Sequence, residues 1–250
     1  MKKIWLLPCT IFLVLCFSCS KNDKLLSNQG LKEVPVFLLT PDILSEYKFY
    51  PLENKLKLTY KDDQLARITG GFLPIPTVTE LSYIFTDIIY WDVNIVGDQV
   101  KLEKKSSSSE ILFNERHDLW YNNGRITERR IYRSDQPVSR YKYEYENNRL
   151  KKEYKYLDDR LSLERTFYFN AKQNLDSILY EYPYSADKVV EIFMDYDQKP
   201  NKLKNLLVFE DFIPRALSTN NYLKMSRLYI DDAGVRSPSV ERKWDAQLFN

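Results

Sequence analysis

The stretch Tyr141–Glu146, which reads YKYEYE, decides the fold of this chain. Tyrosines and charged residues alternate strictly in it, so a β-strand places all the tyrosines on one face and all the charges on the other. A helix would instead scatter the tyrosines around its circumference. The stretch therefore predicts a strand with one buried face and one face in contact with water.

The runs that follow this stretch have the same strand character. Leu150–Leu157 is expected to place Leu150, Lys152, Tyr154 and Tyr156 on one side. Leu161–Phe169 places leucines and phenylalanines on one side, with Arg165 as the exception. Turn signals separate the runs at intervals of about 11 to 12 residues, which is the length of one strand plus a tight turn. These signals are Asn123–Gly124, Ser134–Pro137, Asn147–Asn148, Asp158–Asp159 and Asn170–Asn174.

The regular spacing predicts an all-β domain of consecutive antiparallel hairpins, a meander that forms a strongly twisted sheet or an open barrel. Asn123–Gly124 is the strongest two-residue hairpin signal in the chain. The stretch Thr69–Thr77, with two glycines and two prolines, is expected to be an irregular loop. Helical periodicity is hard to find anywhere after the N-terminal segment.

The N-terminus has the pattern of a secretory signal peptide. Lys2 and Lys3 precede the apolar stretch Ile4–Phe17, and the small residue Ser18 precedes Cys19. At about 14 residues the apolar stretch is shorter than the roughly 20 that a membrane-spanning helix needs. We therefore expect residues 1–18 to be removed, residues 19–33 to form a flexible tether, and residues 34–250 to fold as a single domain.

The junction Leu15–Cys19 resembles a lipobox, the site where a bacterial lipoprotein is cut before a cysteine that carries lipid. The resemblance implies lipid on Cys19 and, through it, a membrane as the first partner. Cleavage without lipid remains an alternative. The next residues, Ser20–Lys24, resemble the sorting signal of surface lipoproteins of Bacteroidota, which implies an outer-membrane protein on the cell surface or on the periplasmic face.

Cysteine usage and charge exclude several classes of function. All the cysteines, Cys9, Cys16 and Cys19, lie in or at the end of the signal, so the mature domain has neither disulfides nor thiolate metal sites. Without Lys2 and Lys3, basic residues equal the 35 acidic residues in number. A nucleic-acid partner is therefore not expected, because such proteins usually carry a basic excess.

Two stretches, Leu58–Ile68 and Tyr143–Leu150, are similar to degenerate Tyr-Asp (YD, or RHS-type) repeats. Phe193–Asp197 and Leu217–Asn221 are similar to the C-terminal part of repeat-containing lipoproteins of Bacteroidota. The resemblance implies an uncharacterised surface lipoprotein of that group. Most turns here lack the glycine of true YD repeats and the copies are few, so encapsulation of a toxin is not carried over.

Two sets of residues could carry chemistry. His117 is the single histidine, and beside Asp118 it could act as a general base, although a strand-end position is the simpler interpretation. Asp195 and Asp197 could face the same side of a strand and bind a cation or act as an acid/base pair, although the solvent-exposed face of a strand is the simpler interpretation. The sequence thus predicts no catalytic residue, no cofactor and no metal.

Charged and aromatic surface residues remain. Five arginines crowd one region, and carboxylates lie close to them in sequence, so the mixed charges favour a salt-bridged sheet face over an anion site. The arginines are Arg125, Arg129, Arg130, Arg133 and Arg140, and the carboxylates are Glu144, Glu146, Asp158 and Asp159. Exposed aromatic residues of a sheet can stack on sugars or contact a protein partner. The sequence therefore favours a non-enzymatic cell-envelope protein that binds or scaffolds a glycan or an envelope protein. The alternative is a glycan hydrolase that uses two carboxylates and needs neither histidine nor cysteine.

Overall fold

The computed structural model describes residues 25–27, 30–36, 54–76, 81–134, 136–204 and 206–244. Strands make up most of this part, which confirms the expected all-β fold. The strands are β1 (Glu33–Pro35), β2 (Lys55–Lys61), β3 (Gln64–Pro76), β4 (Leu81–Val96), β5 (Gln99–Ser106), β6 (Glu115–Asn122), β7 (Arg125–Arg133), β8 (Gln136–Glu146), β9 (Arg149–Leu157), β10 (Arg160–Phe169), β11 (Leu175–Glu181), β12 (Lys188–Pro200), β13 (Asn220–Ile230) and β14 (Arg236–Lys243).

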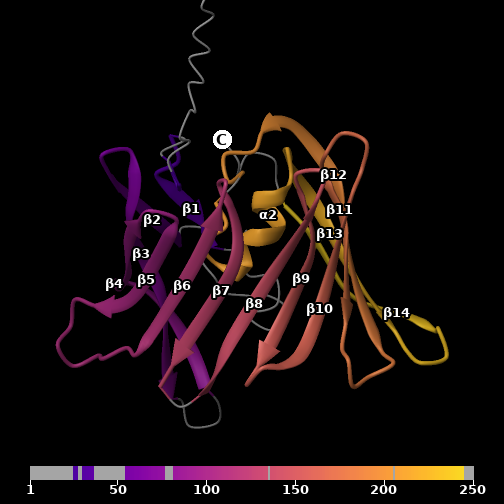
Figure 1. Cartoon of the computed structure of the whole chain (residues 1–250), viewed down its shortest axis with the longest axis horizontal. Coiled ribbons are helices and arrows are strands. Elements are labelled where there is room, and N and C mark those ends of the chain that lie inside the picture. Colours follow the sequence, from indigo (N-terminus) through magenta and orange to yellow (C-terminus); the bar gives the residue numbers. More distant parts are fainter. Residues whose placement is uncertain are drawn as a thin grey trace, which may run out of the picture.

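The strands form one sheet in sequence order, from β1 at one edge to β14 at the other. Every pair of neighbours is antiparallel, as in the meander that the turn spacing predicts. The first and last described strands do not pair with each other, so the sheet is open. It curls strongly, which gives it a concave and a convex face (Figure 1).

Tight turns with left-handed backbone connect many of the strands. At the turn between β6 and β7, φ is 50° at Asn123 and 73° at Gly124, which confirms the expected hairpin. Both central residues of Asp62–Asp63, Asn147–Asn148 and Asp158–Asp159 also have positive φ. This is the type I′ geometry, whose twist matches that of the flanking strands. Asn and Asp tolerate it better than other non-glycine residues, which explains why most of these turns need no glycine.

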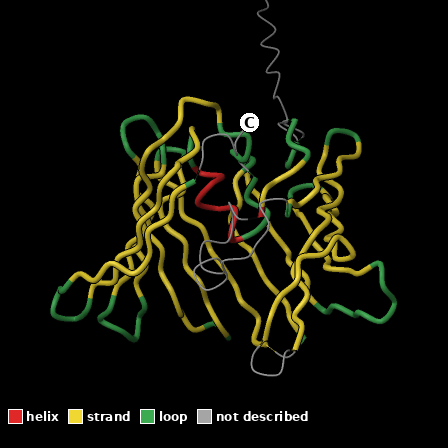
Figure 2. The backbone as a smooth tube through the Cα atoms, turned by 180° about the vertical axis from the view of Figure 1, so that it is seen from behind, coloured by secondary structure: helices red, strands yellow, loops and turns green. Residues whose placement is uncertain are grey.

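The connection between β12 and β13 folds back into the concave side of the sheet. Residues 201–218, here called the inner segment, contain the 3-10 turn η2 (Glu210–Phe212) and the short helix α2 (Ile213–Leu217). Both views place α2 inside the curve of the sheet (Figures 1 and 2). With only five residues, α2 is too short to leave a helical period in the sequence.

The hydrophobic core lies between the concave face and the inner segment. A single curled sheet leaves its concave side open unless another part of the chain covers it. The inner segment supplies this cover, and each large apolar side chain that it buries contributes roughly 1.5 to 3 kcal/mol. Fully or almost fully buried members of the core include Leu102, Leu119, Ile126, Phe167, Ile178 and Phe193 of the sheet and Leu203, Val208, Phe212 and Ile213 of the inner segment.

The face predicted for β8 is confirmed, but the one predicted for β9 is wrong. Tyr141 and Tyr143 are only 2% and 7% exposed, on the concave face. In the next strand, Glu144 pairs with Lys152 and Tyr145 with Leu150, so Lys151 is an extra residue, a β-bulge. The bulge reverses the alternation, and Leu150 and Glu153 are the buried residues. The expected grouping of Leu150 with Lys152, Tyr154 and Tyr156 fails because alternation alone does not reveal a bulge.

The irregular loop predicted at Thr69–Thr77 is also wrong, because β3 runs through to Pro76. Its two glycines instead mark an irregularity in the pairing with β4. Gly70 has φ of 116°, and a Cβ atom at Gly71 would lie 2.8 Å from Cγ2 of Ile89. Glycine is needed here for a bulge and for close packing of neighbouring strands, rather than for a loop.

The described part of the expected tether contacts the sheet. The amide of Leu65 donates a hydrogen bond of 3.1 Å to the carbonyl of Leu26, and Ser27 forms a bridge with Gln64. Leu25, Leu26 and Leu31 pack against the core. Cys19 and the expected signal segment, residues 1–18, lie outside the described residues. Within the described ranges, no helix is long and apolar enough to cross a membrane.

Candidate binding site

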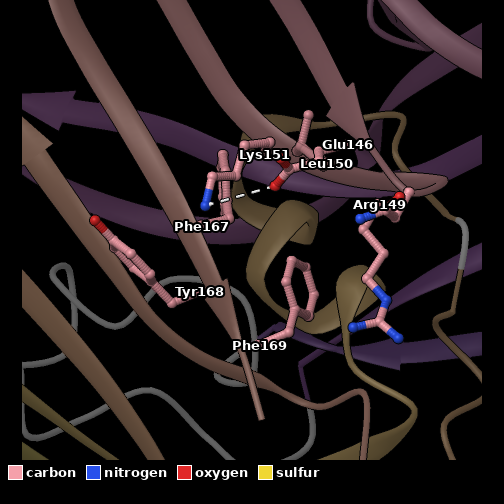
Figure 3. Close-up of a pocket in the computed structure, with 8 residues that line it drawn as sticks. Glu146, Arg149, Leu150, Lys151, Phe167, Tyr168 and Phe169 are labelled. Atoms are coloured by element: carbon pink, nitrogen blue, oxygen red, sulfur yellow. Dashed lines mark ion pairs between the residues drawn. The ribbon is translucent and has the colours of Figure 1, made fainter. Parts of the chain in front are cut away.

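A hollow of about 230 Å³ opens between β9 and β10 at the end of the sheet that carries the Asn147–Asn148 turn (Figure 3). Its lining comes from the end of β8, the turn that follows it, the start of β9 and the end of β10. The residues are Glu146, Asn147, Arg149, Leu150, Lys151, Phe167, Tyr168 and Phe169.

Local irregularities of the sheet create this hollow. The cross-strand pairs of β9 and β10 end at Lys152 and Thr166. Beyond that point β9 stays paired with β8 as far as Arg149, and β10 stays paired with β11 as far as Phe169. Both of these outer pairings contain a register shift at this level. Because bulges bend the strands that carry them, a gap forms between the two strands.

The lining combines aromatic rings with charges of both signs. The Arg149 guanidinium lies 5.8 Å from the centroid of the Phe169 ring, and the Lys151 ammonium lies 5.2 Å from that of Tyr168. Glu146 faces Lys151 across the hollow with a separation of 4.0 Å (Figure 3). Tyr168 is 42% exposed, whereas Phe167 is almost fully buried. The hollow therefore offers one accessible ring, two cations and a carboxylate to a small polar ligand.

A buried ionic network lies on the concave face beside the hollow. Glu153 pairs with Arg165 on the neighbouring strand, and Nε of Arg165 donates to Oε1 of Glu153 over 2.7 Å. The Nη2 atom of the same arginine lies 3.2 Å from Oε1 of Glu210 in the inner segment. Tyr141 donates its hydroxyl to Oε2 of Glu210 over 2.9 Å. The network thus attaches the inner segment to the sheet through a carboxylate.

The pKa values of the two carboxylates in this network, Glu153 and Glu210, are shifted in opposite directions. Burial raises the pKa of Glu153 against the effect of Arg165, which lowers it. Burial also opposes ionisation of Glu210, but Arg165, Lys155 and Arg129 outweigh it and lower the pKa of Glu210. The negative charge of Glu210 raises the pKa of the completely buried Glu153 further, whereas the hydrogen bond from Tyr141 lowers the pKa of Glu210 further.

Arg129 lies next to this network and is completely buried. Its Nη2 atom donates to the backbone carbonyl of Leu207 over 2.8 Å, a second attachment of the inner segment. Its Nε and Nη1 atoms have no hydrogen-bond partner, and neither do the hydroxyls of Tyr121, Tyr143 and Tyr145. Unsatisfied buried polar atoms of this kind cost about 1 to 3 kcal/mol each. The loss of hydration of these polar atoms therefore lowers the net stability of this region of the core.

His117 and Asp118 are not brought together as a catalytic pair. They are neighbours on β6 and point to opposite faces. The His117 ring packs 4.8 Å from that of Trp91 inside the core, and burial lowers its pKa although a hydrogen bond to Glu115 raises it. Asp118 lies on the other face, 3.2 Å from Nε of Arg116. His117 is thus a core residue.

Asp195 and Asp197 do not form a cation site. Asp195 has φ of 55°, which interrupts the regular alternation on which the same-face expectation rested. The oxygens of Asp197 accept hydrogen bonds from the backbone and side-chain amides of Asn221 at 3.1 and 3.0 Å. Among the described residues, no group of three or more His, Cys, Asp or Glu could hold a metal.

The arginines behave largely as the mixed charges indicate. Arg130 pairs with Glu128 at 2.6 Å and Arg140 with Asp159 at 3.0 Å, both at the surface. Arg129 and Arg165 instead point into the core. Sequence reasoning missed their partners, Glu153 and Glu210, although Arg165 stood out as a charge on an apolar face. The position of Arg165 on an apolar face was the sequence feature that could have revealed the buried network, because a buried arginine needs a carboxylate or a carbonyl nearby.

No protein-family model matches the chain, and no curated protein is similar to it at a significant level. The likeness to YD-repeat lipoproteins therefore stays a prediction.

Proposed function

We propose that this chain is a non-enzymatic, lipid-anchored protein of the outer membrane that binds a glycan through the hollow between β9 and β10. The observation that supports the proposal is the lining of the hollow, where the partly exposed Tyr168 ring lies beside Arg149, Lys151 and Glu146. Aromatic faces stack on the apolar side of a sugar ring, and charged groups around them bind the hydroxyls.

The size of the hollow limits what it can hold. Pockets that enclose a drug-sized ligand measure about 300 to 1,000 Å³. At about 230 Å³, this hollow accommodates one sugar unit of a longer chain. We therefore expect recognition of a single residue or of a chain end, with modest affinity, rather than enclosure of an oligosaccharide.

A binding experiment tests this function. The domain without its signal segment is passed over a panel of immobilised oligosaccharides, and any that is retained is titrated by calorimetry. Tyr168→Ala should weaken binding about fivefold, because stacking on an aromatic ring contributes about 1 kcal/mol. Tyr184→Ala is the matched control, since this ring is 83% exposed in another turn. Retention of no glycan, or equal affinity of both variants, would contradict the proposal.

A second candidate function is hydrolysis of a glycan by Glu153 and Glu210. The observation that favours it is the opposite displacement of their pKa values, which is the pattern of an acid and a base that act together. Their contacts with Arg165 and Tyr141 explain the same pair as an attachment of the inner segment. Release of reducing ends from an oligosaccharide by the purified domain, abolished in Glu210→Gln with the fold retained, would establish the enzyme and exclude the purely binding function.

A further inference from the structure

The cations around the hollow outnumber the carboxylates. Arg149 and Lys151 line it, and Glu146 is the carboxylate among the lining residues. Arg125 of the adjacent turn reaches the same place, because its Nη2 donates to the Asn148 side chain over 2.7 Å. The turn at the mouth of the hollow thus joins two arginines from neighbouring hairpins.

The guanidinium groups of Arg149 and Arg125 are able to bind an anion. Among the described residues, Arg149 and Arg125 form no ion pair. The Arg149 guanidinium lies 5.8 Å from the centroid of the Phe169 ring, and that of Arg125 lies 5.7 Å from the centroid of Tyr145. Glu146 is already directed towards Lys151, at the long separation of 4.0 Å. Arginine presents a planar fork of N–H donors that matches a carboxylate or a phosphate, so an anionic group at the mouth would gain charge-assisted hydrogen bonds.

We infer that the hollow selects an acidic sugar, one that carries a carboxylate, with Arg149 as the specificity-determining residue. The inference rests on the proposed glycan-binding function and narrows its ligand. The sugar ring lies against Tyr168, the accessible ring of the lining, and its carboxylate faces Arg149 and Arg125. A neutral sugar makes the same ring contact but offers the two arginines no negatively charged group.

The test uses one sugar skeleton with and without its charge. Tetragalacturonate and its fully methyl-esterified form are titrated into the domain at low and at high salt. The acid should bind about tenfold more tightly at low salt, and the difference should shrink as salt screens the exposed charges. Arg149→Gln should remove the preference for the acid, so that the acid and the ester bind with equal affinity.

The chain offers a matched control in Arg160→Gln. Arg160 follows Asp158–Asp159 as Arg149 follows Asn147–Asn148, but at the opposite end of the same strand pair. It should leave the preference intact. Equal affinity for acid and ester would overturn the inference and leave the binding function standing. Failure of both probes and of every other glycan would overturn the function itself. Displacement of the acid by an equal concentration of inorganic phosphate would show a general anion site and would also overturn the inference.

Discussion

Two tyrosines of the same strand differ in what their hydroxyls contact. Tyr141 donates to Glu210 over 2.9 Å, whereas the hydroxyl of Tyr143 is buried without a partner. Both rings face the concave side and are almost fully buried. The apolar contribution of the two rings is therefore similar, and the hydroxyl decides the difference between them.

Removing each hydroxyl should have opposite effects on stability. Tyr141→Phe should cost about 1.5 to 3 kcal/mol, because it deletes a hydrogen bond to a charged group. Tyr143→Phe should be neutral or stabilise by about 1 kcal/mol, because it removes an unsatisfied polar atom from the core. Urea unfolding followed by tryptophan fluorescence measures both. A cost at Tyr143 equal to that at Tyr141 would mean that its hydroxyl has a partner after all.

Glu115, at the start of β6, is a carboxylate held in its ionised form. Its burial favours the protonated form, but a hydrogen bond from His117 and the charges of Lys104 and Arg133 lower its pKa to about 2. A carboxyl with a lowered native pKa contributes stability that is present above its unfolded pKa and is lost as pH falls through the native value. The relevant interval runs from about pH 4.5 down to about pH 2.

In the Glu115→Gln variant, the free energy of unfolding should therefore fall less steeply as the pH decreases through this interval. The difference between wild type and variant should be at most about 3 kcal/mol above pH 5 and should vanish near pH 2. Urea unfolding at a series of pH values measures it. Glu110→Gln, a change in an exposed loop, is the control and should leave the profile unchanged. A constant difference at all pH values would show that Glu115 acts through packing rather than charge.

At the scale of the element, the turns fix the register of the sheet. The turn between β6 and β7 needs positive φ at both central residues, and a Cβ atom at Gly124 would meet nothing within 4 Å. Any cost of a larger residue there comes from the backbone alone. The test of this turn is thus free of steric side effects.

Gly124→Val should destabilise the domain by about 1 to 3 kcal/mol, because a β-branched residue is strained at this φ. Arg125→Val should be nearly neutral, because Val suits a strand and the exchange removes only a surface contact. Thermal unfolding compares the two. The reverse order would place the turn at least one residue away, and such a slip would exchange the faces of β7.

At this scale the sequence predicts the strands and turns, because their formation depends mainly on residues that are adjacent in sequence. Alternation at Tyr141–Glu146 and the pair Asn123–Gly124 are local signals, and both are confirmed. The bulge at Lys151 and the inner segment depend on contacts between distant residues. The contact of Arg129 with Leu207 joins residues 78 positions apart, and no local pattern reveals it. The hollow escaped prediction for the same reason, since bulges create it.

For the whole molecule, the described N-terminal residues indicate how the domain would sit on its anchor. Leu26 and Ser27 are attached to the start of β3, next to the turn between β2 and β3. From Cys19 to Leu25 an extended chain reaches at most about 20 Å. If lipid is attached at Cys19, this end of the sheet is held close to the membrane. The hollow, beside the Asn147–Asn148 turn, lies at the same end, because alternate turns of a meander share an end.

The proposed lipid anchor is tested by Cys19→Ala in the full chain. The change should abolish incorporation of labelled fatty acid and release the domain into the soluble fraction after signal cleavage. The reason is that acyl chains bind a bilayer with about 0.8 kcal/mol per buried CH₂ group, so that two or more chains hold firmly where a single chain binds only marginally. Cys16→Ala is the matched control, since it changes a cysteine of the same junction and should leave labelling intact. Retention of the cleaved Cys19→Ala protein in the membrane fraction would show that another part of the chain binds the membrane.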